Sequence, residues 1–437
     1  MTDDDALSVF AAAAATPAAA AIMTADRVLT FAELAELVTA PARRPPFAGA
    51  AGRPPLAGSG AGAEALIALP ELSTLLAVYG ALADRRPLAL LHARLPASEQ
   101  ARQREAVAAA SLADDPAFVL FTSGSTASAR GVVLSRAAIL ANAHASAARL
   151  GWHADDRWLL VLSLAHSGGL SVLTRCLVAR KPIVFETGAS LIHRATLASL
   201  VPTQLAALLE DPAWGPPPHL RAVLLGGAAA PPALLAAARA RGVPIRTTYG
   251  LTETFGQVAT APDAHSPPVP LPGVTLLAGT DAAAPAPIHV RGPMLATRYL
   301  DGAPIAPELV TADLGYTDAT GALHVTGRAD DVIITGGENV HPTAVEAVLA
   351  ATPGVRAALA FGVRDERWGQ LVAVALAVDD VATFDLAAAA ASWRAALPPH
   401  ALPRRVALAA ALPHGATGKL DRRAAAALPA IAVRYSR

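Results

Sequence analysis

A run of hydroxyl side chains is the first place in this sequence where chemistry is expected. Residues 118–121 are an apolar strand-like run, followed by Thr122, Ser123, Gly124, Ser125 and Thr126 and then, at a short distance, by Arg130. Backbone N–H groups and hydroxyls in such a loop can surround phosphate oxygens, and the arginine adds positive charge. The loop lacks the Gly-Lys-Ser/Thr ending of a Walker motif. Taken alone, it is equally consistent with a solvated turn.

Two charged residues in other glycine-containing stretches suit phosphate chemistry. Glu253 ends the stretch Tyr249-Gly250-Leu251-Thr252-Glu253, and its carboxylate is a hard oxygen ligand suited to Mg²⁺. Lys419 follows the glycine-rich residues 415–418, where a compact ammonium can reach a carboxylate and phosphoryl oxygens. The alternatives are a surface glutamate after a turn and a solvated lysine.

His166, Ser167 and Arg175 are polar residues in a largely apolar part of the sequence. His166 and Ser167 precede a Gly-Gly pair, although a lone histidine is more often structural. Arg175 lies among Leu173, Cys176 and Leu177, so it needs a partner if it is buried. An ordinary ion pair is one such partner.

The elements that must position these residues alternate between strands and helices. A strand over 65–69, a helix over 70–83 and a strand over 87–91 predict a βαβ unit and a parallel sheet. Strands over 118–121, 158–162, 181–185, 220–225 and 244–248 alternate with helices over 136–149, 168–178, 196–210 and 231–241. Thr30 and Glu33 predict a capping box, and residues 40–62 an irregular loop.

The pattern changes after residue 267. Short apolar runs between Pro and Gly over 267–326 predict antiparallel strands, in the manner of a small barrel. Residues 342–409 then read as helix 343–351, strands 355–363 and 371–378, helix 385–397 and strand 405–409. The predicted fold class is α/β: a large N-terminal domain, 1–327, of parallel-sheet layers with a small β-barrel-like part, followed by a small α+β domain, 328–437.

Composition excludes several classes of protein. Of the 437 residues, 53% are hydrophobic and 16% charged, which allows a large core and argues against global disorder. The formal net charge of +0 argues against a nucleic-acid partner. A single cysteine, Cys176, supports neither a disulfide framework nor a cysteine zinc site, and fits a cytoplasmic location. The acidic N-terminus lacks a signal-peptide pattern, and no apolar run predicts a membrane span.

Four stretches in this order resemble the adenylate-forming superfamily of acyl-CoA synthetases, peptide-synthetase adenylation domains and luciferases. They are residues 122–126, 249–253, 311–313 with 327–340, and 415–422. Residues 162–170, 198–205 and 220–228 narrow the resemblance to the o-succinylbenzoate–CoA ligases of menaquinone biosynthesis. The resemblance implies ATP, Mg²⁺ and coenzyme A as reactants or cofactors. Alternatives are another aryl- or acyl-CoA ligase, a stand-alone adenylation enzyme, or a nucleotide-binding relative without turnover.

The resemblance also implies roles in the nucleotide site. The hydroxyl loop and Arg130 would hold the β- and γ-phosphates, Glu253 would bind Mg²⁺, and Tyr249 would stack on adenine. Asp313 would accept hydrogen bonds from the ribose, and Arg328 would reach the ribose or a phosphate. The residues implied for ATP or AMP binding are Thr122, Ser123, Gly124, Ser125, Thr126, Arg130, Gly226, Gly227, Ala228, Tyr249, Gly250, Thr252, Asp313 and Arg328.

A mobile C-terminal domain is implied for the second half of the reaction. Asp330 would be its hinge, near residues 328–331, and Gly336, Gly337 and Glu338 would line the coenzyme A tunnel. The acyl group would meet His166, Ser167 and Arg175. For Arg175, the second carboxylate of a dicarboxylic substrate and an ordinary ion pair are equally good partners. The catalytic set is Lys419, Thr252, Glu253 and His166. One departure stands out: the family loop continues Gly-x-Pro-Lys-Gly, and this chain has Ala127-Ser-Ala-Arg-Gly131. The oligomeric state stays open between a monomer and a homodimer.

Overall fold

The computed structural model describes residues 6–40, 62–112, 115–122, 129–185, 189–305, 307–415 and 420–435, with only the backbone of 189–191. The chain divides into two compact units. The N-terminal unit comprises Met1–Ala230, Ala237–Leu276 and Val290–Leu309, and the C-terminal unit comprises Pro231–Ala236, Leu277–His289 and Val310–Arg437. The boundary predicted at 327–328 lies within the C-terminal unit and stays a prediction of where the chain pivots.

A five-stranded sheet in the N-terminal unit confirms the predicted βαβ unit. Its order is β16-β6-β5-β4-β3, and β3, β4 and β5 are parallel. Helix α4 (Leu72–Ala83) connects β3 to β4, and its many buried residues explain its apolar sequence. The strands are β3 (Glu64–Ala68), β4 (Leu88–His92), β5 (Pro116–Phe121), β6 (Gly131–Ser135) and β16 (Arg298–Tyr299).

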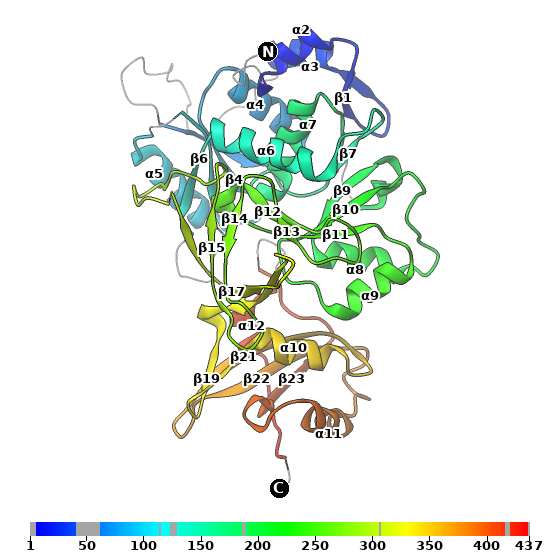
Figure 1. Cartoon of the computed structure of the whole chain (residues 1–437), viewed down its shortest axis with the longest axis vertical. Helices are drawn as coiled ribbons and strands as arrows, with labels where there is room; N and C mark the ends of the chain where they lie inside the picture. Colours follow the sequence, from blue (N-terminus) through cyan, green and yellow to red (C-terminus); the bar gives the residue numbers. More distant parts are fainter. Residues whose placement is uncertain are drawn as a thin grey trace. The chain divides into compact units, whose positions relative to one another are not determined.

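A nine-stranded sheet forms the larger part of the same unit. Its order is β13-β12-β11-β10-β9-β7-β8-β1-β2, and the six strands from β11 to β1 run parallel. Figure 1 shows these strands in blue to green, with α6 (Arg136–Leu150) and α7 (Ser167–Ala179) close by. The strands are β1 (Ala20–Met23), β2 (Val28–Thr30), β7 (Trp158–Leu160), β8 (Ile183–Phe185), β9 (Leu197–Leu200), β10 (Ala222–Leu225), β11 (Ile245–Leu251), β12 (Gly256–Thr260) and β13 (Val269–Pro270).

The prediction of one helix over 196–210 is wrong. Residues Leu197–Leu200 form β9, and α8 begins only at Pro202 and ends at Glu210. All four residues of β9 are buried, because the strand lies between β7 and β10 in the sheet. A strand that is buried on both faces has no alternating pattern, so it resembles a helical segment in sequence. The proline at the first helical position then marks the true start of the helix.

One helix of this unit, α3 (Phe31–Thr39), begins at the capping box that the sequence predicts. The capping box predicted at Thr30 is present: Glu33 N–H donates to Thr30 Oγ1 at 3.2 Å, and Thr30 N–H donates to the Glu33 carboxylate at 2.8 Å. Two helices that we did not predict are α2 (Val9–Ala15) and α5 (Ala97–Ala109). The irregular loop predicted over 40–62 falls largely outside the described residues.

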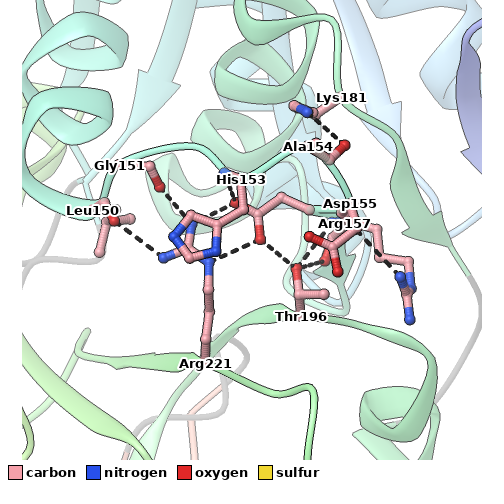
Figure 2. Close-up of polar contacts among 10 residues, drawn as sticks. Leu150, Gly151, His153, Ala154, Asp155, Arg157, Lys181, Thr196 and Arg221 are labelled. Carbon is pink, nitrogen blue, oxygen red and sulfur yellow. Dashed lines mark hydrogen bonds and ion pairs between the residues drawn. The ribbon is translucent and has the colours of Figure 1, made fainter.

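A polar network fixes the amino ends of the parallel strands. Asp156, just before β7, is 1% exposed, and its carboxylate accepts hydrogen bonds from Arg221 Nε, from Thr196 Oγ1 and from the His153 N–H, each at 2.8 Å. Arg221 precedes β10 and Thr196 precedes β9, so one carboxylate joins the starts of three strands. Figure 2 shows Arg221, Thr196 and His153 converging, with Arg221 also reaching the Leu150 carbonyl.

The predicted α+β part is confirmed in the C-terminal unit. Its sheet has the order β20-β19-β22-β23-β24, with β21 paired to β22. Trp393, on helix α11, is fully buried, and its indole N–H donates to Thr352 Oγ1 at 2.9 Å. The elements, yellow to red in Figure 1, are β19 (Ile333–Thr335), β20 (Glu338–Val340), α10 (Pro342–Ala350), β21 (Val355–Asp365), β22 (Gly369–Val378), α11 (Leu386–Ala396), β23 (Arg405–Ala409), α12 (Arg422–Ala426) and β24 (Ile431–Ala432).

The strands expected after residue 267 are present. A four-stranded sheet has the order β14-β15-β17-β18, and β17 pairs antiparallel with β18. Its strands are β14 (Thr275–Leu277), β15 (Ala286–Arg291), β17 (Leu309–Thr317) and β18 (Leu323–Arg328). Across the described residues, none of the helices has the length and apolarity that crossing a bilayer requires.

Candidate active site

Several predicted residues follow the carboxyl ends of parallel strands in the nine-stranded sheet. Gly226 and Gly227 come directly after β10, and Thr252 and Glu253 come directly after β11. His166 precedes α7, on the connection that leaves β7. In open α/β sheets, ligands bind outside the carboxyl ends of the strands. The Asp156 network lies at the opposite, amino ends of the strands. The predicted ligand site and the stabilising network are therefore at different ends of the strands.

The backbone after β10 leaves no room for side chains on one side. A Cβ atom on Gly226 would lie 2.2 Å from Thr248 Oγ1 on the neighbouring β11. Gly227 has a φ of +78°, in the left-handed region that favours glycine. Gly227 and Ala228 are exposed. This stretch is therefore an accessible backbone surface, which suits the flat base predicted there.

A tight hairpin presents Thr252 and Glu253. Both belong to the 3₁₀ turn Thr252–Thr254 between β11 and β12. A Cβ atom on Gly250 would lie 1.9 Å from the Gly256 carbonyl oxygen, so the hairpin itself requires glycine at that position. Tyr249 is half-buried on β11 and pairs with Ala259.

Asn142 supports this hairpin, and the sequence reasoning missed it. The side chain is fully buried on α6, and its amide N–H₂ donates to the carbonyls of Thr254 at 3.2 Å and Gln257 at 2.9 Å. Its amide oxygen accepts a hydrogen bond from Arg175 Nη2 at 2.7 Å. Asn142 and Ser146, one turn apart among the buried residues of α6, are the signal that could have found it, because buried polar side chains need partners.

Glu253 and Arg130 both contact Tyr299, which lies outside the four predicted motifs. The Tyr299 hydroxyl donates to Glu253 Oε1 at 3.1 Å, and the Arg130 guanidinium carbon lies 3.5 Å from the centre of the tyrosine ring. Arg130 Nη2 also reaches both oxygens of Asp301, at 2.9 and 3.2 Å. Burial and the neighbouring Glu253 carboxylate raise the pKa of Tyr299 to about 12, so its hydroxyl remains a donor at neutral pH.

The base of the hydroxyl loop is closed by a pair of hydrogen bonds. The Thr122 N–H donates to the Arg130 carbonyl at 2.9 Å, and the Arg130 N–H donates to Thr122 Oγ1 at 3.1 Å. Ser123, Gly124, Ser125 and Thr126 lie outside the described residues, so their roles stay predictions. The structure thus brings the start of this loop, Arg130 and Glu253 together around one tyrosine.

The residues predicted for the acyl group border the same hairpin. Ser167 begins α7, and a Cβ atom on Gly256 would lie 3.8 Å from its side chain. The His166 ring lies 5.0 Å from the ring of His92, which ends β4. Burial lowers the pKa of His92, so this neighbour favours its neutral form.

Arg175 is a buried cation without a carboxylate partner among the described residues. It is 3% exposed; its Nη2 donates to Asn142, and its Nε has no partner in the described part of the chain. The guanidinium carbon lies 5.7 Å from the Trp158 ring. Burial lowers the pKa of Arg175, which expresses the cost of keeping this charge unpaired. Cys176 beside it is buried, and burial likewise raises the pKa of its thiol.

In the C-terminal unit, Asp313, Arg328 and Asp330 form one chain of ion pairs. Arg328 Nη1 lies 3.0 Å from Asp313 Oδ1, across the β17–β18 pairing, and Arg328 Nη2 lies 3.1 Å from Asp330 Oδ2. The ribose, phosphate and hinge roles of these residues stay predictions. Their contact shows that a residue assigned to the nucleotide is tied directly to the residue assigned to the hinge.

The local structure explains why glycine is present at positions 336 and 337. Gly336 and Gly337 form a two-residue turn between Thr335 and Glu338, with φ values of +59° and +87°. A Cβ atom on Gly336 would also lie 2.6 Å from the Trp368 ring. The hairpin therefore accounts for both glycines, and the coenzyme A tunnel remains a prediction for them and for the exposed Glu338.

Lys419 lies outside the described residues, but both flanks of its loop are fixed. His414 and Leu420 form an isolated antiparallel bridge that brings the ends of the loop together. Two residues further on, Arg422 Nη2 lies 2.9 Å from Glu346 Oε1 and Nη1 lies 3.3 Å from Asp331 Oδ2. Burial raises the pKa of Glu346 despite this pairing.

The carboxylate of Glu253 suits a Mg²⁺ ion that is bound together with substrate phosphates, rather than a metal ion held by protein ligands alone. The described residues contain no group of three or more His, Cys, Asp or Glu side chains that could hold a metal ion. Glu253 offers one carboxylate next to the predicted phosphate site. Mg²⁺ is usually bound by one or two carboxylates together with substrate phosphates and water.

Comparisons with known proteins agree with this arrangement. The model of the AMP-binding enzyme family matches residues 61–300, and that of the AMP-binding enzyme C-terminal domain matches residues 344–419. The 2-succinylbenzoate–CoA ligase of Geobacillus kaustophilus is 32% identical over 336 residues, or 71% of this chain and 69% of that protein. The ligase of Bacillus mycoides is 34% identical over 58% of each chain.

Solved structures that resemble this chain cover nearly all of it. The o-succinylbenzoate CoA synthetase of Bacillus subtilis, in complex with the acyl-adenylate OSB-AMP, covers 95% of this chain and 96% of its own, with a TM-score of 0.81 and 27% identity. The amide bond synthetase McbA of Marinactinospora thermotolerans covers 96% and 98%, with a TM-score of 0.78 and 26% identity. The family models and the Geobacillus relative together establish that this chain belongs to the AMP-binding enzyme family.

Proposed function

We propose that this protein is an AMP-forming acid–thiol ligase that converts o-succinylbenzoate into its coenzyme A thioester. One observation carries the proposal: the match over 95% of the chain to a synthetase solved with OSB-AMP. Further solved forms of that synthetase contain ATP with a magnesium ion, and the product analogue OSB-NCoA. By this proposal the enzyme serves menaquinone biosynthesis.

In the first half-reaction, a carboxylate oxygen of the acid attacks the α-phosphorus of ATP and pyrophosphate leaves. Catalysis of such a step consists mostly of positioning and charge stabilisation. The exposed backbone of Gly226–Ala228 and the ring of Tyr249 would hold adenine, and Asp313 with Arg328 the ribose. Thr252 would contact the α-phosphate, while the hydroxyl loop and Arg130 would hold the β- and γ-phosphates.

Glu253 would hold Mg²⁺ on the protein side. The ion, when bound, neutralises phosphate charge and orients the leaving pyrophosphate. The hydrogen bond from Tyr299 leaves the other carboxylate oxygen of Glu253, Oε2, available for this purpose.

The acyl group would lie beside His166 and Ser167, and Arg175 would meet the second carboxylate of the substrate. Arg175 supports this role because no acidic side chain among the described residues pairs with it. A dicarboxylic acid would supply the missing negative charge. Its other carboxylate then becomes the group that is activated.

In the second half-reaction, the coenzyme A sulfur attacks the acyl carbon, AMP leaves, and the thiol proton is lost to solvent or a base. By this proposal, rotation near Asp330 moves Lys419 away and brings Gly336, Gly337 and Glu338 to the site. The ion pair between Arg328 and Asp330 would have to adjust during that rotation.

Pyrophosphate release across a panel of acids tests the proposal. With ATP and Mg²⁺ we expect release with o-succinylbenzoate and little with benzoate or fatty acids. The reaction should then be completed with coenzyme A. Release with a different acid only, or with none, contradicts it.

The likeness to an amide bond synthetase favours one second candidate, in which an amine replaces coenzyme A as acceptor. The step with coenzyme A separates the two candidates, because only the acid–thiol ligase yields a thioester. A cytoplasmic location and a homodimer stay predictions; fractionation of cells and size-exclusion chromatography with light scattering would test them.

A further inference from the structure

Tyr299 contacts two residues of the nucleotide site with different parts of its side chain. Its hydroxyl donates to the carboxylate of Glu253, and its ring face carries the guanidinium of Arg130. Glu253 and Arg130 are 123 positions apart in the sequence, yet one side chain of moderate exposure joins them. The tyrosine thus links the ligand proposed for Mg²⁺ to the cation proposed for the phosphates.

The backbone around Tyr299 is held in place by strand pairing. Tyr299 pairs with Val132 in the β16–β6 ladder, so it lies beside the strand that begins immediately after Arg130. The Leu300 N–H donates to the Gly131 carbonyl at 2.7 Å, and the Tyr299 N–H donates to Ala303 at 2.8 Å. On the other side, the Ala296 N–H donates to the Glu253 carbonyl at 2.7 Å. The tyrosine is therefore a fixed point between the two motifs.

Arginine at position 130 suits this surrounding better than lysine. A planar guanidinium can lie flat on an aromatic ring and contact both oxygens of a carboxylate at its edge, whereas an ammonium is a point charge. Arg130 does both, with Tyr299 and Asp301. The pair with Asp301 is exposed, at 43% and 58%, and exposed ion pairs contribute little. The ring of Tyr299 and the carboxylate of Asp301 are separate contacts, so incoming phosphates can replace Asp301 while the guanidinium stays on the ring.

We propose, on the basis of the function proposed above, that Tyr299 is a positioning residue that aligns Glu253 for Mg²⁺ and Arg130 for the ATP phosphates. Through its hydroxyl it fixes one oxygen of Glu253 and directs the carboxylate. Through its ring it keeps the Arg130 fork next to the mouth of the hydroxyl loop. Asp301 holds the arginine until the phosphates arrive.

Nucleotide binding without any acid substrate tests this role directly. We would measure ATP affinity by calorimetry, with Mg²⁺ and again with EDTA, for the natural chain, Tyr299→Phe and Tyr299→Leu. Tyr435→Phe is the matched control, because its hydroxyl donates to the Pro403 carbonyl at 3.1 Å and it lies outside the proposed site. Thermal unfolding of each variant shows whether the fold is kept.

The two variants should separate the two contacts of the tyrosine. Tyr299→Phe keeps the ring and should weaken Mg²⁺–ATP about tenfold, the usual loss for one hydrogen bond to a charged group, with ATP in EDTA within about twofold. Tyr299→Leu also loses the cation–π contact and should weaken ATP in EDTA by a further threefold or so. Tyr435→Phe should bind as the natural chain does.

Equal affinity of Tyr299→Phe and the natural chain for Mg²⁺–ATP would overturn the proposal. A loss of the same size with and without Mg²⁺ would overturn it too, because Glu253 would not be the mediator. These results do not depend on the acid that is used. If the natural chain binds Mg²⁺–ATP but activates no o-succinylbenzoate, the proposed function fails while the role of Tyr299 stands.

Discussion

At the scale of single residues, the proposed function makes Arg175 the residue that selects the substrate. Its charge is buried, its described hydrogen-bond partner is the neutral Asn142, and its Nε is left without one. A buried charge without a counter-charge is costly unless a ligand supplies it. A dicarboxylic acid would do so, and a monocarboxylic acid would not.

Arg175→Ala should therefore raise the Michaelis constant for o-succinylbenzoate. The expected rise is at least about tenfold, because a charge-assisted hydrogen bond is lost in a dry surrounding. Steady-state kinetics would also include two analogues, each lacking one of the two carboxylates. For the analogue without the carboxylate that meets Arg175, natural chain and variant should be alike. An unchanged Michaelis constant for o-succinylbenzoate would rule out this role.

The candidate site residues within motifs could be predicted from the sequence, whereas the residues that hold them in place could not. Glu253, Arg130 and Arg175 could be chosen from sequence because charge next to glycine or inside an apolar helix is unusual. Asn142 contacts Gln257, 115 positions away, and Tyr299 lies against Arg130, 169 positions away in sequence. Such contacts leave no local pattern, so only the folded chain reveals them.

At the scale of elements, the amino ends and the carboxyl ends of the strands in the nine-stranded sheet have different roles. The amino ends of β7, β9 and β10 are joined by the carboxylate of Asp156, which accepts hydrogen bonds from His153, Thr196 and Arg221. Figure 2 shows these three donors together. Arg221 is 18% exposed in its side chain and Asp156 not at all. Two of these strands lead at their other ends to predicted site residues, β7 to His166 and β10 to Gly226 and Gly227.

Asp156→Ala should destabilise the N-terminal unit by about 3–5 kcal/mol, since it leaves Arg221 half-buried without its partner. Denaturant unfolding followed by tryptophan fluorescence would measure the change. Asp115→Asn is the matched control: its pair with Arg85 is exposed, at 45% and 50%, so the loss should be below about 1 kcal/mol. Equal effects of the two changes would contradict the role given to Asp156.

The same carboxylate predicts a pH dependence of stability. Burial raises the pKa of Asp156, but hydrogen bonds from Arg221, the His153 N–H and Thr196 outweigh burial and set it below its ordinary value of 3.8. Its contribution is then full above pH 3.8 and is lost as the pH falls through the lower folded value. The stability difference between the natural chain and Asp156→Asn should shrink in that acid range. A constant difference would show that Asp156 does not titrate as described.

Elements with a strong periodic pattern were predictable and others were not. The five C-terminal elements that were predicted, α10, β21, β22, α11 and β23, start and end within a few residues of their predicted bounds, whereas the short elements β19, β20, α12 and β24 were not predicted. Helix α5 was missed because it buries only Gln103 and Val107, which leaves no apolar stripe to detect. Strand β9 was taken for a helix because it is buried on both faces. The surroundings decide the conformation of β9, whereas α5 consists mostly of good helix formers, so its propensity was the signal that could have found it.

At the scale of the whole molecule, one chain has to perform two reactions with different needs. Adenylation needs positive charge at the α-phosphate, whereas thioester formation needs a path for coenzyme A. The proposal divides these tasks between Lys419 and the hairpin of Gly336 and Gly337, with Asp330 as the pivot. The order of the two domains along the chain could be predicted from motifs, but the pivot itself leaves no signal in composition or periodicity.

Lys419→Ala should separate the two half-reactions. Pyrophosphate release should fall by about a hundredfold or more, as when one charge-stabilising donor is removed from an active site. Thioester formation from supplied acyl-adenylate should keep most of its rate. The chain has only one other lysine, Lys181, whose ammonium donates to the Ala154 carbonyl, so Lys181→Ala is the natural control. Normal adenylation by Lys419→Ala would remove this residue from the mechanism.

The central claim is the identity of the acid and of the acceptor together. The most direct measurement is the product formed from ATP, Mg²⁺, coenzyme A and o-succinylbenzoate, with AMP and thioester quantified by chromatography and mass spectrometry. We predict one AMP for each o-succinylbenzoyl thioester, and a kcat/KM at least about a hundredfold above that for benzoate, because only the dicarboxylic acid pairs with Arg175. A thioester formed equally well from monocarboxylic acids, or AMP without any thioester, would contradict it.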